Sequence, residues 1–178
     1  SMEQKRRIQS FLELAVSAAA LTGLDQWTKF LAVKHLKDQA DIALIPNVLY
    51  LHYLENRGAA FGMFQNQKVF LVLLTSLILI GVCYVLWKLP EGKHFLPLKI
   101  LCFLITAGGI GNLADRLRLN YVVDFIYFSP IDFPVFNIAD IYVTVSMVLL
   151  FLLVLFYYKD EDFQFLKWKS PKQQEQES

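Results

Sequence analysis

The sequence contains few charged residues and very few cysteines. Asp, Glu, Lys and Arg make up 19% of its 178 residues, compared with ~25% in an ordinary soluble domain. Its two cysteines, Cys83 and Cys102, both lie in apolar runs. They are interpreted as small packing residues rather than as part of a disulfide framework or a zinc site. A formal net charge of +1 gives no electrostatic reason to expect a nucleic-acid partner.

Signatures of several common enzyme classes are also missing. The three histidines, His35, His52 and His94, are scattered and show no metal-ligand spacing. No glycine-rich phosphate loop occurs, and no histidine lies close to the acidic residues between positions 115 and 140, as a serine triad would require. We therefore predict that the protein uses neither a metal nor a cofactor.

The sequence is rich in long apolar segments. Hydrophobic residues make up 56% of the chain, above the ~45–50% of soluble domains. Because a helix rises ~1.5 Å per residue, about 20 apolar residues cross the ~30 Å hydrocarbon core of a bilayer. Four such segments are predicted, at about residues 11–33, 69–88, 98–114 and 137–158. The predicted fold class is an all-α membrane protein with four transmembrane helices, forming one integral membrane domain over residues 1–178.

The first segment is the weakest of the four because it contains Glu13, Asp25 and Lys29, and ionisable groups inside a span are costly. Glu13 lies near one end and can reach the interface. Asp25 and Lys29 are four residues apart on one helical face, with the acid N-terminal to the base, so they can pair. An ordinary ion pair at the membrane edge and a pair that shapes a functional site are both open interpretations.

The polar connection between the first two spans predicts a small extracytoplasmic β-sheet lying on the membrane surface. Ile42–Leu54 has the β-branched and aromatic residues of short strands, interrupted by Pro46-Asn47. A turn-prone run of small residues, Glu55–Gly62, follows it. At the other end of the chain, the Gln- and Glu-rich tail from about residue 168 is predicted to be disordered.

The distribution of Lys and Arg predicts how the chain lies in the membrane. An even number of spans puts both termini on one side, and the segments on that side carry more Lys and Arg than the connections on the other. Such an excess marks the cytoplasmic face, so both termini are predicted to be cytoplasmic. The connection between the third and fourth spans is then extracytoplasmic.

Three aspartates follow the third span. Asp124 lies in an apolar run, and Asp140 lies about one turn into the fourth span, where Asn137 can cap the helix. Asp132 lies in the proline-containing turn between them and is interpreted as an ordinary turn residue. Because this connection returns the chain to the membrane, Asp124 and Asp140 can meet near the same interface.

Such a pair of carboxylates can cleave a peptide bond. Two carboxylates that share a site cannot easily both ionise, so one keeps a proton. The ionised member can take a proton from water that attacks a carbonyl, and the protonated member can donate to the carbonyl oxygen and later to the leaving amine. Paired acids also occur in proton-coupled transporters, and in a membrane scaffold they could merely cap helices. The pair alone therefore leaves a peptidase, a transporter and a scaffold open.

Five short motifs narrow this choice. They are Asp25-x-x-x-Lys29, Asn56-x-Gly58-Ala59-Ala60-Phe61-Gly62, Gly111-Asn112-x-x-Asp115-Arg116, Val123-Asp124-Phe125 and Phe136-Asn137-x-Ala139-Asp140. In this order, over roughly residues 11–158, the set resembles the lipoprotein signal peptidases (signal peptidase II). Each motif is short, but the five together on a four-span hydropathy profile are highly specific.

The resemblance implies an aspartic endopeptidase of the bacterial cytoplasmic membrane. It would remove the signal peptide from diacylglyceryl-modified prolipoproteins, cutting just before the lipidated cysteine, with its active site near the extracytoplasmic face. Its partners would be this precursor and membrane lipids, and we expect it to act as a monomer. The family's catalytic dyad falls on Asp124 and Asp140. The positions that match site-supporting or substrate-binding residues are Asp25, Lys29, Asn56, Gly58, Asn112, Asp115, Arg116 and Asn137.

Two further expectations concern the end of the third span. Gly108, Gly109 and Gly111 would permit the close approach of a neighbouring helix or of the substrate backbone. Arg116 could contact a substrate carbonyl or a lipid phosphate through its forked donors, or it could simply snorkel to the headgroups.

Overall fold

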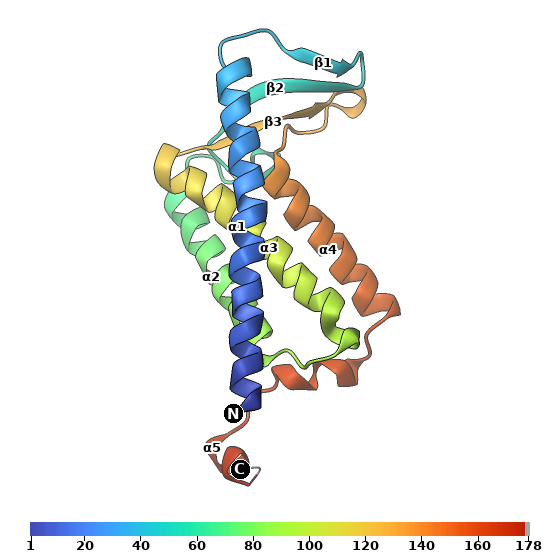
Figure 1. Cartoon of the computed structure of the whole chain (residues 1–178). Helices are drawn as coiled ribbons and strands as arrows, with labels where there is room; N and C mark the ends of the chain where they lie inside the picture. The colour runs from blue at the N-terminus through green and yellow to red at the C-terminus, as the bar shows by residue number, and fades with distance from the viewer. Residues whose placement is uncertain (177–178) are drawn as a thin grey trace.

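Long helices and a small sheet make up the structure, a computed structural model that describes residues 1–176 (Figure 1). The helices are α1 (Met2–Leu36), α2 (Lys68–Lys88), α3 (Leu96–Leu119) and α4 (Ile138–Phe156). The strands β1 (Ile42–Ile45), β2 (Leu49–Asn56) and β3 (Val122–Phe128) lie together at one end of the molecule, beside the last turns of α1. In Figure 1, α1 runs in front of α3, and both termini lie at the end opposite the sheet.

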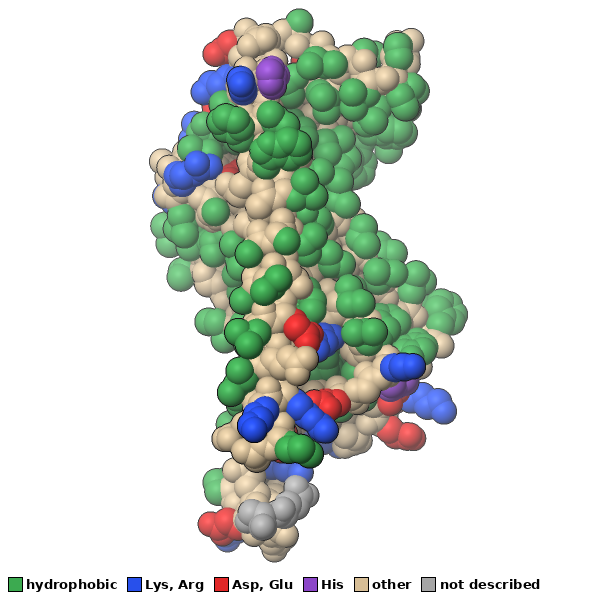
Figure 2. Space-filling model, in the orientation of Figure 1, with side chains coloured by type: hydrophobic (Ala, Val, Ile, Leu, Met, Phe, Trp, Pro, Cys, Tyr) green, Lys and Arg blue, Asp and Glu red, His purple; other side chains and the backbone are tan. Residues whose placement is uncertain are grey.

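Three stretches are long and apolar enough to cross a membrane, namely Lys68–Lys88, Lys93–Leu119 and Ile138–Phe156. They correspond to three of the predicted spans, although α3 continues to Leu119, so that Asp115 and Arg116 lie on the helix itself. Helix α1 does not reach the same apolar length, because its polar residues lower its hydropathy. In Figure 2, apolar side chains cover the helical part of the surface, and charged side chains gather towards its two ends.

The sheet is antiparallel, with the strand order β1-β2-β3. The two short strands predicted between residues 42 and 54 are present, and Asn47 in the turn between them has a left-handed backbone (φ 62°). Strand β3 was not predicted. It pairs with β2 so that Asp124 lies opposite Leu54. Its first half is buried, with Val123 packed near Ala32 of α1, so it reads as a continuous apolar run without the alternation that marks a half-buried strand.

Glycines let α3 pack closely against its neighbours. A Cβ on Gly108 would lie 2.7 Å from the carbonyl oxygen of Ala139 in α4, and one on Gly111 would lie 2.5 Å from a carboxylate oxygen of Asp25 in α1. Gly109 faces α2. The expectation of close helix approach is therefore confirmed. The expectation that these glycines make room for the substrate backbone is wrong, because the neighbouring helices already occupy the space.

Replacing Gly111 by Ala should lower the apparent Tm in detergent, whereas replacing Gly23 by Ala should not. The added methyl group at position 111 would overlap a buried carboxylate, and overpacking of this kind costs about 1–3 kcal/mol. Nothing lies within 4 Å of a Cβ on Gly23, so Ala there gains up to about 1 kcal/mol of helix propensity. Thermal unfolding of both variants gives the comparison. Equal Tm values would show that Gly111 is not a tight contact.

After α4 the chain turns back across the ends of the helices. The segment η4 (Asp160–Leu166) meets α2, where the Tyr84 hydroxyl donates to the carbonyl oxygen of Leu166 at 3.3 Å. The last described helix is the short α5 (Pro171–Glu175). Disorder of the tail from about residue 168 stays a prediction, and residues 177–178 lie outside the described residues.

Candidate active site

A buried ion cluster joins α1 to α3 near the sheet. The Lys29 ammonium lies 2.8 Å from a carboxylate oxygen of Asp25 and 3.1 Å from one of Asp115, and the three side chains are 3%, 0% and 0% exposed. The predicted pair within α1 is therefore present. Lys29 also binds Asp115 on another helix, so the pair is more than an ordinary ion pair at the membrane edge. Buried charges are tolerated only when they are paired and hydrogen-bonded, as these are.

Asp25 and Gln26 extend this cluster. The second carboxylate oxygen of Asp25 accepts from the backbone N–H of Ala139 at 2.8 Å, in the first turn of α4, where backbone amides have no partner within the helix. The Gln26 amide donates to Asp115 at 3.0 Å and to the carbonyl oxygen of Gly111 at 3.1 Å. Gln26 was not predicted as a site residue, because a single glutamine in a helix forms no recognisable motif. Only its position next to Asp25 could have indicated a role.

Lys29 also fixes the orientation of the Asn112 amide. Its ammonium donates to Oδ1 of Asn112 at 2.9 Å, and a lysine can only donate. The NH₂ group of Asn112 therefore points the other way and donates to Oδ1 of Asp140 at 2.9 Å. The charge cluster therefore turns the NH₂ group of Asn112, and not its oxygen, towards the Asp140 carboxylate.

Asn137 bridges the two aspartates. Its NH₂ group donates to Oδ1 of Asp124 at 2.8 Å, and its Oδ1 accepts from the backbone N–H of Asp140 at 2.9 Å. In return, Oδ2 of Asp140 accepts from the backbone N–H of Asn137 at 3.2 Å, which completes a capping box at the start of α4. The predicted cap is confirmed. A side chain that is 0% exposed thus holds a carboxyl of β3 beside a carboxyl of α4.

The end of β2 and the loop after it lie beside Asp124. The Asn56 NH₂ group donates to Oδ2 of Asp124 at 3.2 Å, and the Asn56 Oδ1 accepts from the N–H of Gly58 at 2.9 Å. Arg116 donates to the carbonyl oxygen of Gly58 at 3.2 Å, so its guanidinium braces the loop. Glycine is required at position 58, because a Cβ there would overlap the carbonyl oxygen of Met63.

All four carboxylate oxygens of the pair accept a hydrogen bond. Asn137 and Asn56 donate to Asp124, and Asn112 and the Asn137 backbone donate to Asp140. Asp124 is only 1% exposed. Burial, followed by the charge of Asp140, raises the pKa of Asp124 to about 7, although the hydrogen bonds from Asn56 and Asn137 favour its charged form. Near neutral pH this carboxyl is therefore poised between its two protonation states, as a shared proton requires.

The two carboxyls open onto one cavity of about 270 Å³. Asn56, Asn112 and Arg116 form its polar wall. Its apolar wall comes from the segment 133–136 and from one face of α4 that includes Val145. These apolar residues were not predicted as part of the site. In the sequence, only their positions could have pointed to the site: some lie in the proline-containing connection, and the others follow Asp140. The cavity can therefore take a chain that has a polar backbone on one side and an apolar group on the other.

Most of the predicted site residues lie in this cavity or in the charge cluster. The other two are Gly58, in the loop that Arg116 contacts, and Asn137, which bridges the two aspartates. Asp132 lies apart from them, with a left-handed backbone (φ 47°) after η3 (Ser129–Ile131), and its carboxylate accepts from the Tyr127 hydroxyl at 2.6 Å. Its interpretation as a turn residue is confirmed. Within residues 1–176, no three His, Cys, Asp or Glu side chains are grouped so that they could hold a metal ion. The absence of a cofactor stays a prediction.

The chain is similar in sequence to known proteins. A family model described as signal peptidase (SPase) II matches residues 17–156, which include both the cavity and the charge cluster. The chain is 45% identical over 141 residues to a lipoprotein signal peptidase of Streptococcus thermophilus (strain CNRZ 1066), which covers 79% of this chain and 91% of the relative. It is 43% identical over 142 residues to a lipoprotein signal peptidase of Caldanaerobacter subterraneus subsp. tengcongensis, with 79% and 94% covered.

Two solved structures share the fold. One is a bacterial membrane enzyme determined by the in meso method at 2.3 Å resolution, with a TM-score of 0.73 and 29% identity over 89% of this chain and 93% of that chain. Another, determined by the same method at 1.9 Å, has a TM-score of 0.72 and 30% identity over 82% and 94%. Since the family model matches most of the chain, and relatives match it over most of their own length, the chain belongs to the signal peptidase II family of membrane aspartic peptidases.

Proposed function

We propose that Asp124 and Asp140 form the catalytic pair with which this chain, as a signal peptidase II, removes the signal peptide from prolipoproteins. The bridge through Asn137 carries the assignment, because it holds the two carboxyls side by side at one cavity. Two other carboxylates, those of Asp25 in α1 and Asp115 in α3, are fully buried, but both are paired with Lys29. They are therefore assigned as supports.

The pair activates water without a covalent intermediate. The ionised carboxylate removes a proton from a water molecule while the water oxygen attacks the scissile carbonyl carbon, and the protonated carboxyl donates its proton to the carbonyl oxygen. A tetrahedral diol results. As the C–N bond breaks, the first carboxyl gives its new proton to the leaving nitrogen, and the second recovers a proton from the diol. Both acids return to their starting states.

The apolar wall of the cavity supports a lipid-modified substrate. We infer that the bond cut is the one before a cysteine that carries diacylglycerol, so the acyl chains lie beside the leaving nitrogen. Ile141 and Val145 of α4 line this side of the cavity. Each buried methylene contributes about 0.8 kcal/mol, but the chains are already in the bilayer before binding. The main effect of the lipid is therefore to place the scissile carbonyl against the two carboxyls.

We also propose that α1 crosses the membrane, which gives four spans together with α2, α3 and α4. The residues that lower its hydropathy, Asp25 and Lys29, face inward, whereas Val16, Trp27 and Phe30 are exposed, so lipid would meet an apolar surface. The excess of Lys and Arg near the termini then places both ends in the cytoplasm. The cavity lies near the extracytoplasmic face of the bacterial cytoplasmic membrane, and one chain supplies the complete site as a monomer.

A precursor that carries diacylglycerol should be cleaved at least about a hundredfold faster than the same precursor without it, because placement of the scissile bond lowers the barrier by several kcal/mol. The two precursors are compared at equal concentration with the purified chain in one bilayer composition, and the products are identified by mass. The new N-terminus should be the lipidated cysteine. Cleavage by the Asp124→Asn variant gives the background from contaminating proteases. Equal cleavage of both precursors would identify a general membrane protease instead.

A further inference from the structure

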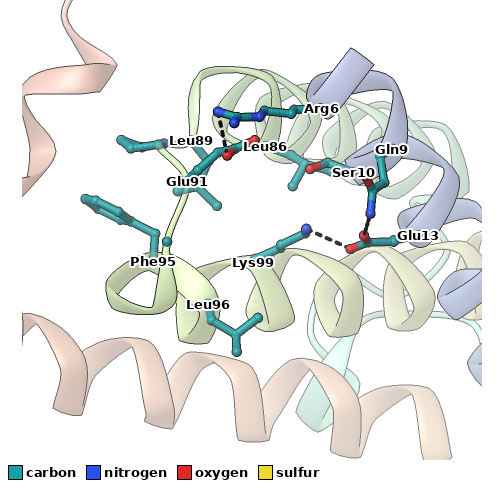
Figure 3. A pocket seen from close by; sticks show the side chains of 12 residues that line it. Arg6, Gln9, Ser10, Glu13, Leu86, Leu89, Glu91, Phe95, Leu96 and Lys99 are labelled. Carbon is teal, nitrogen blue, oxygen red and sulfur yellow. Dashed lines mark hydrogen bonds and ion pairs between the residues drawn. The ribbon is translucent and has the colours of Figure 1, made fainter. Parts of the chain in front are cut away.

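A second cavity, of about 320 Å³, lies near the N-terminal end of α1, which is opposite the sheet in Figure 1. Figure 3 shows its lining from close by. Its walls come from the first turns of α1, the end of α2, the connection after it and the start of α3. It shares no residue with the cavity of Asp124 and Asp140. The apolar stretches Lys68–Lys88 and Lys93–Leu119 end and begin here, so a bilayer crossed by these helices would place the cavity where hydrocarbon gives way to lipid headgroups.

Two ion pairs lie on different sides of this cavity. Arg6 of α1 lies 3.0 Å from Glu91 in the α2–α3 connection, and Lys99 of α3 lies 2.7 Å from Glu13 of α1. The Gln9 amide also donates to Glu13, at 3.2 Å. Figure 3 shows both pairs bordering the hollow between the helices. The charged side chains of the lining therefore present both signs and no net charge.

We propose that this cavity binds a phospholipid headgroup that carries both a phosphate and a primary ammonium. The phosphate would lie between Arg6 and Lys99, whose N–H groups form strong charge-assisted bonds with phosphate oxygens. The ammonium would donate to Glu13 and Glu91. A purely anionic headgroup would compete for the same two cations and leave both carboxylates without partners. A trimethylated ammonium has no N–H to donate.

The ion pairs can rearrange at low cost. The Arg6 and Glu91 side chains are 55% and 54% exposed, and those of Lys99 and Glu13 are 22% and 41% exposed. Ion pairs at such exposed positions contribute little stability, so a headgroup can insert between them. Leu89 and Leu96 line the same cavity and offer an apolar surface to the glycerol and the first acyl methylenes.

A lipid bound at this site would strengthen the contact between the start of α1 and its neighbours. One ion pair joins α1 to the α2–α3 connection and the other joins α1 to the start of α3, and the headgroup would add further bonds across the same gap. In the proposed orientation the lipid comes from the cytoplasmic leaflet, and this choice of leaflet rests on the proposed function. The site is independent of the catalytic pair.

The test titrates the purified full chain in detergent with short-chain phosphatidylethanolamine, phosphatidylglycerol and phosphatidylcholine, with Tm and native mass spectrometry as readouts. Phosphatidylethanolamine should raise the Tm saturably and bind at least about tenfold more tightly than the other two. Free phosphoethanolamine should need at least about tenfold higher concentration than the lipid. Equal potency of the free compound, or tighter binding of phosphatidylglycerol, would overturn the proposal.

Variants of the lining locate the site. Glu13→Gln and Lys99→Gln should each weaken phosphatidylethanolamine binding at least about tenfold and leave cleavage at the distant catalytic pair unchanged. Lys93→Gln, a nearby exposed lysine outside the cavity lining, is the matched control and should bind as the wild type does. If the lining variants bind like this control, the proposal is wrong. Where a variant yields too little folded protein, the headgroup series on the unaltered chain still decides.

Discussion

Asp124→Asn and Asp140→Asn should each reduce cleavage of a lipidated precursor by at least about a thousandfold, the size of effect associated with removing an acid–base group. Asparagine keeps the shape and one acceptor oxygen, so the bonds from the Asn137 side chain and backbone can persist. An amide cannot take or give the shared proton. Initial rates measured by product mass, with unfolding curves for each variant, separate lost chemistry from lost folding.

The control for this experiment is Asp132→Asn. Asp132 lies in a turn of the same connection and is bonded to Tyr127, outside the cavity. Its replacement should leave the rate within about twofold of the wild type, as for most surface changes. A well-folded Asp124→Asn or Asp140→Asn protein that cleaves near the wild-type rate would refute the assignment of the pair. A loss at Asp132 as large as theirs would move the pair elsewhere.

Lys29→Met should be the most destabilising single change in the charge cluster. It would leave the carboxylates of Asp25 and Asp115 buried without their cation, and breaking a buried pair in this way costs about 3–5 kcal/mol. For a chain of this size that corresponds to an apparent Tm lower by roughly 10 °C. Cleavage should fall as well, because the Asn112 amide would no longer be held with its NH₂ group towards Asp140.

Two variants make this result specific. Lys34→Met removes an exposed lysine from the same helix and should leave the Tm nearly unchanged. Adding Asp115→Asn to Lys29→Met removes one of the orphaned charges and should recover part of the lost Tm. If Lys29→Met were as stable as Lys34→Met, the cluster would not support the site. If the second substitution lowered the Tm further, an uncompensated charge would not be the cause.

The motifs predicted which residues lie close together, but they did not predict which hydrogen bonds join them. Asp124 and Asp140 were expected near one interface, and the structure brings them together. The role of Asn137 as a bridge between them was not predicted, because it depends on β3 lying beside the first turn of α4. Likewise, Asp25 was expected to pair within its helix, but its bond to the amide of Ala139 joins residues 114 positions apart. Contacts over such separations leave no local periodicity in the sequence.

Secondary structure was predicted best where the hydrophobic pattern was long. The helices α2 and α4 have long apolar runs, and both were placed to within a few residues. The end of α3 was placed too early, because Asp115 and Arg116 read as the start of a loop, whereas the helix carries them to Leu119. Their charges are accommodated there by Lys29 and by the loop at Gly58, neither of which is near in sequence.

The pH dependence of kcat/KM for a lipidated precursor tests the shared proton most directly. Burial, together with the charge of Asp140, raises the pKa of Asp124 to about 7, so the proton is present below this pH and is lost above it. With both carboxylates ionised, the pair has no donor for the carbonyl oxygen. We predict that kcat/KM falls about tenfold per pH unit above about pH 7. Tm measured at each pH controls for unfolding.

The same pH profile of the Asn56→Ala variant tests whether Asp124 holds this proton. The Asn56 amide donates to Asp124 and thereby lowers its pKa, so its removal should shift the falling limb of the profile to higher pH. The predicted result is a wild-type limb near pH 7 and a limb at higher pH in the variant. A wild-type profile that stays flat from about pH 6 to 9 would contradict the shared-proton mechanism, as would a limb that does not move in Asn56→Ala.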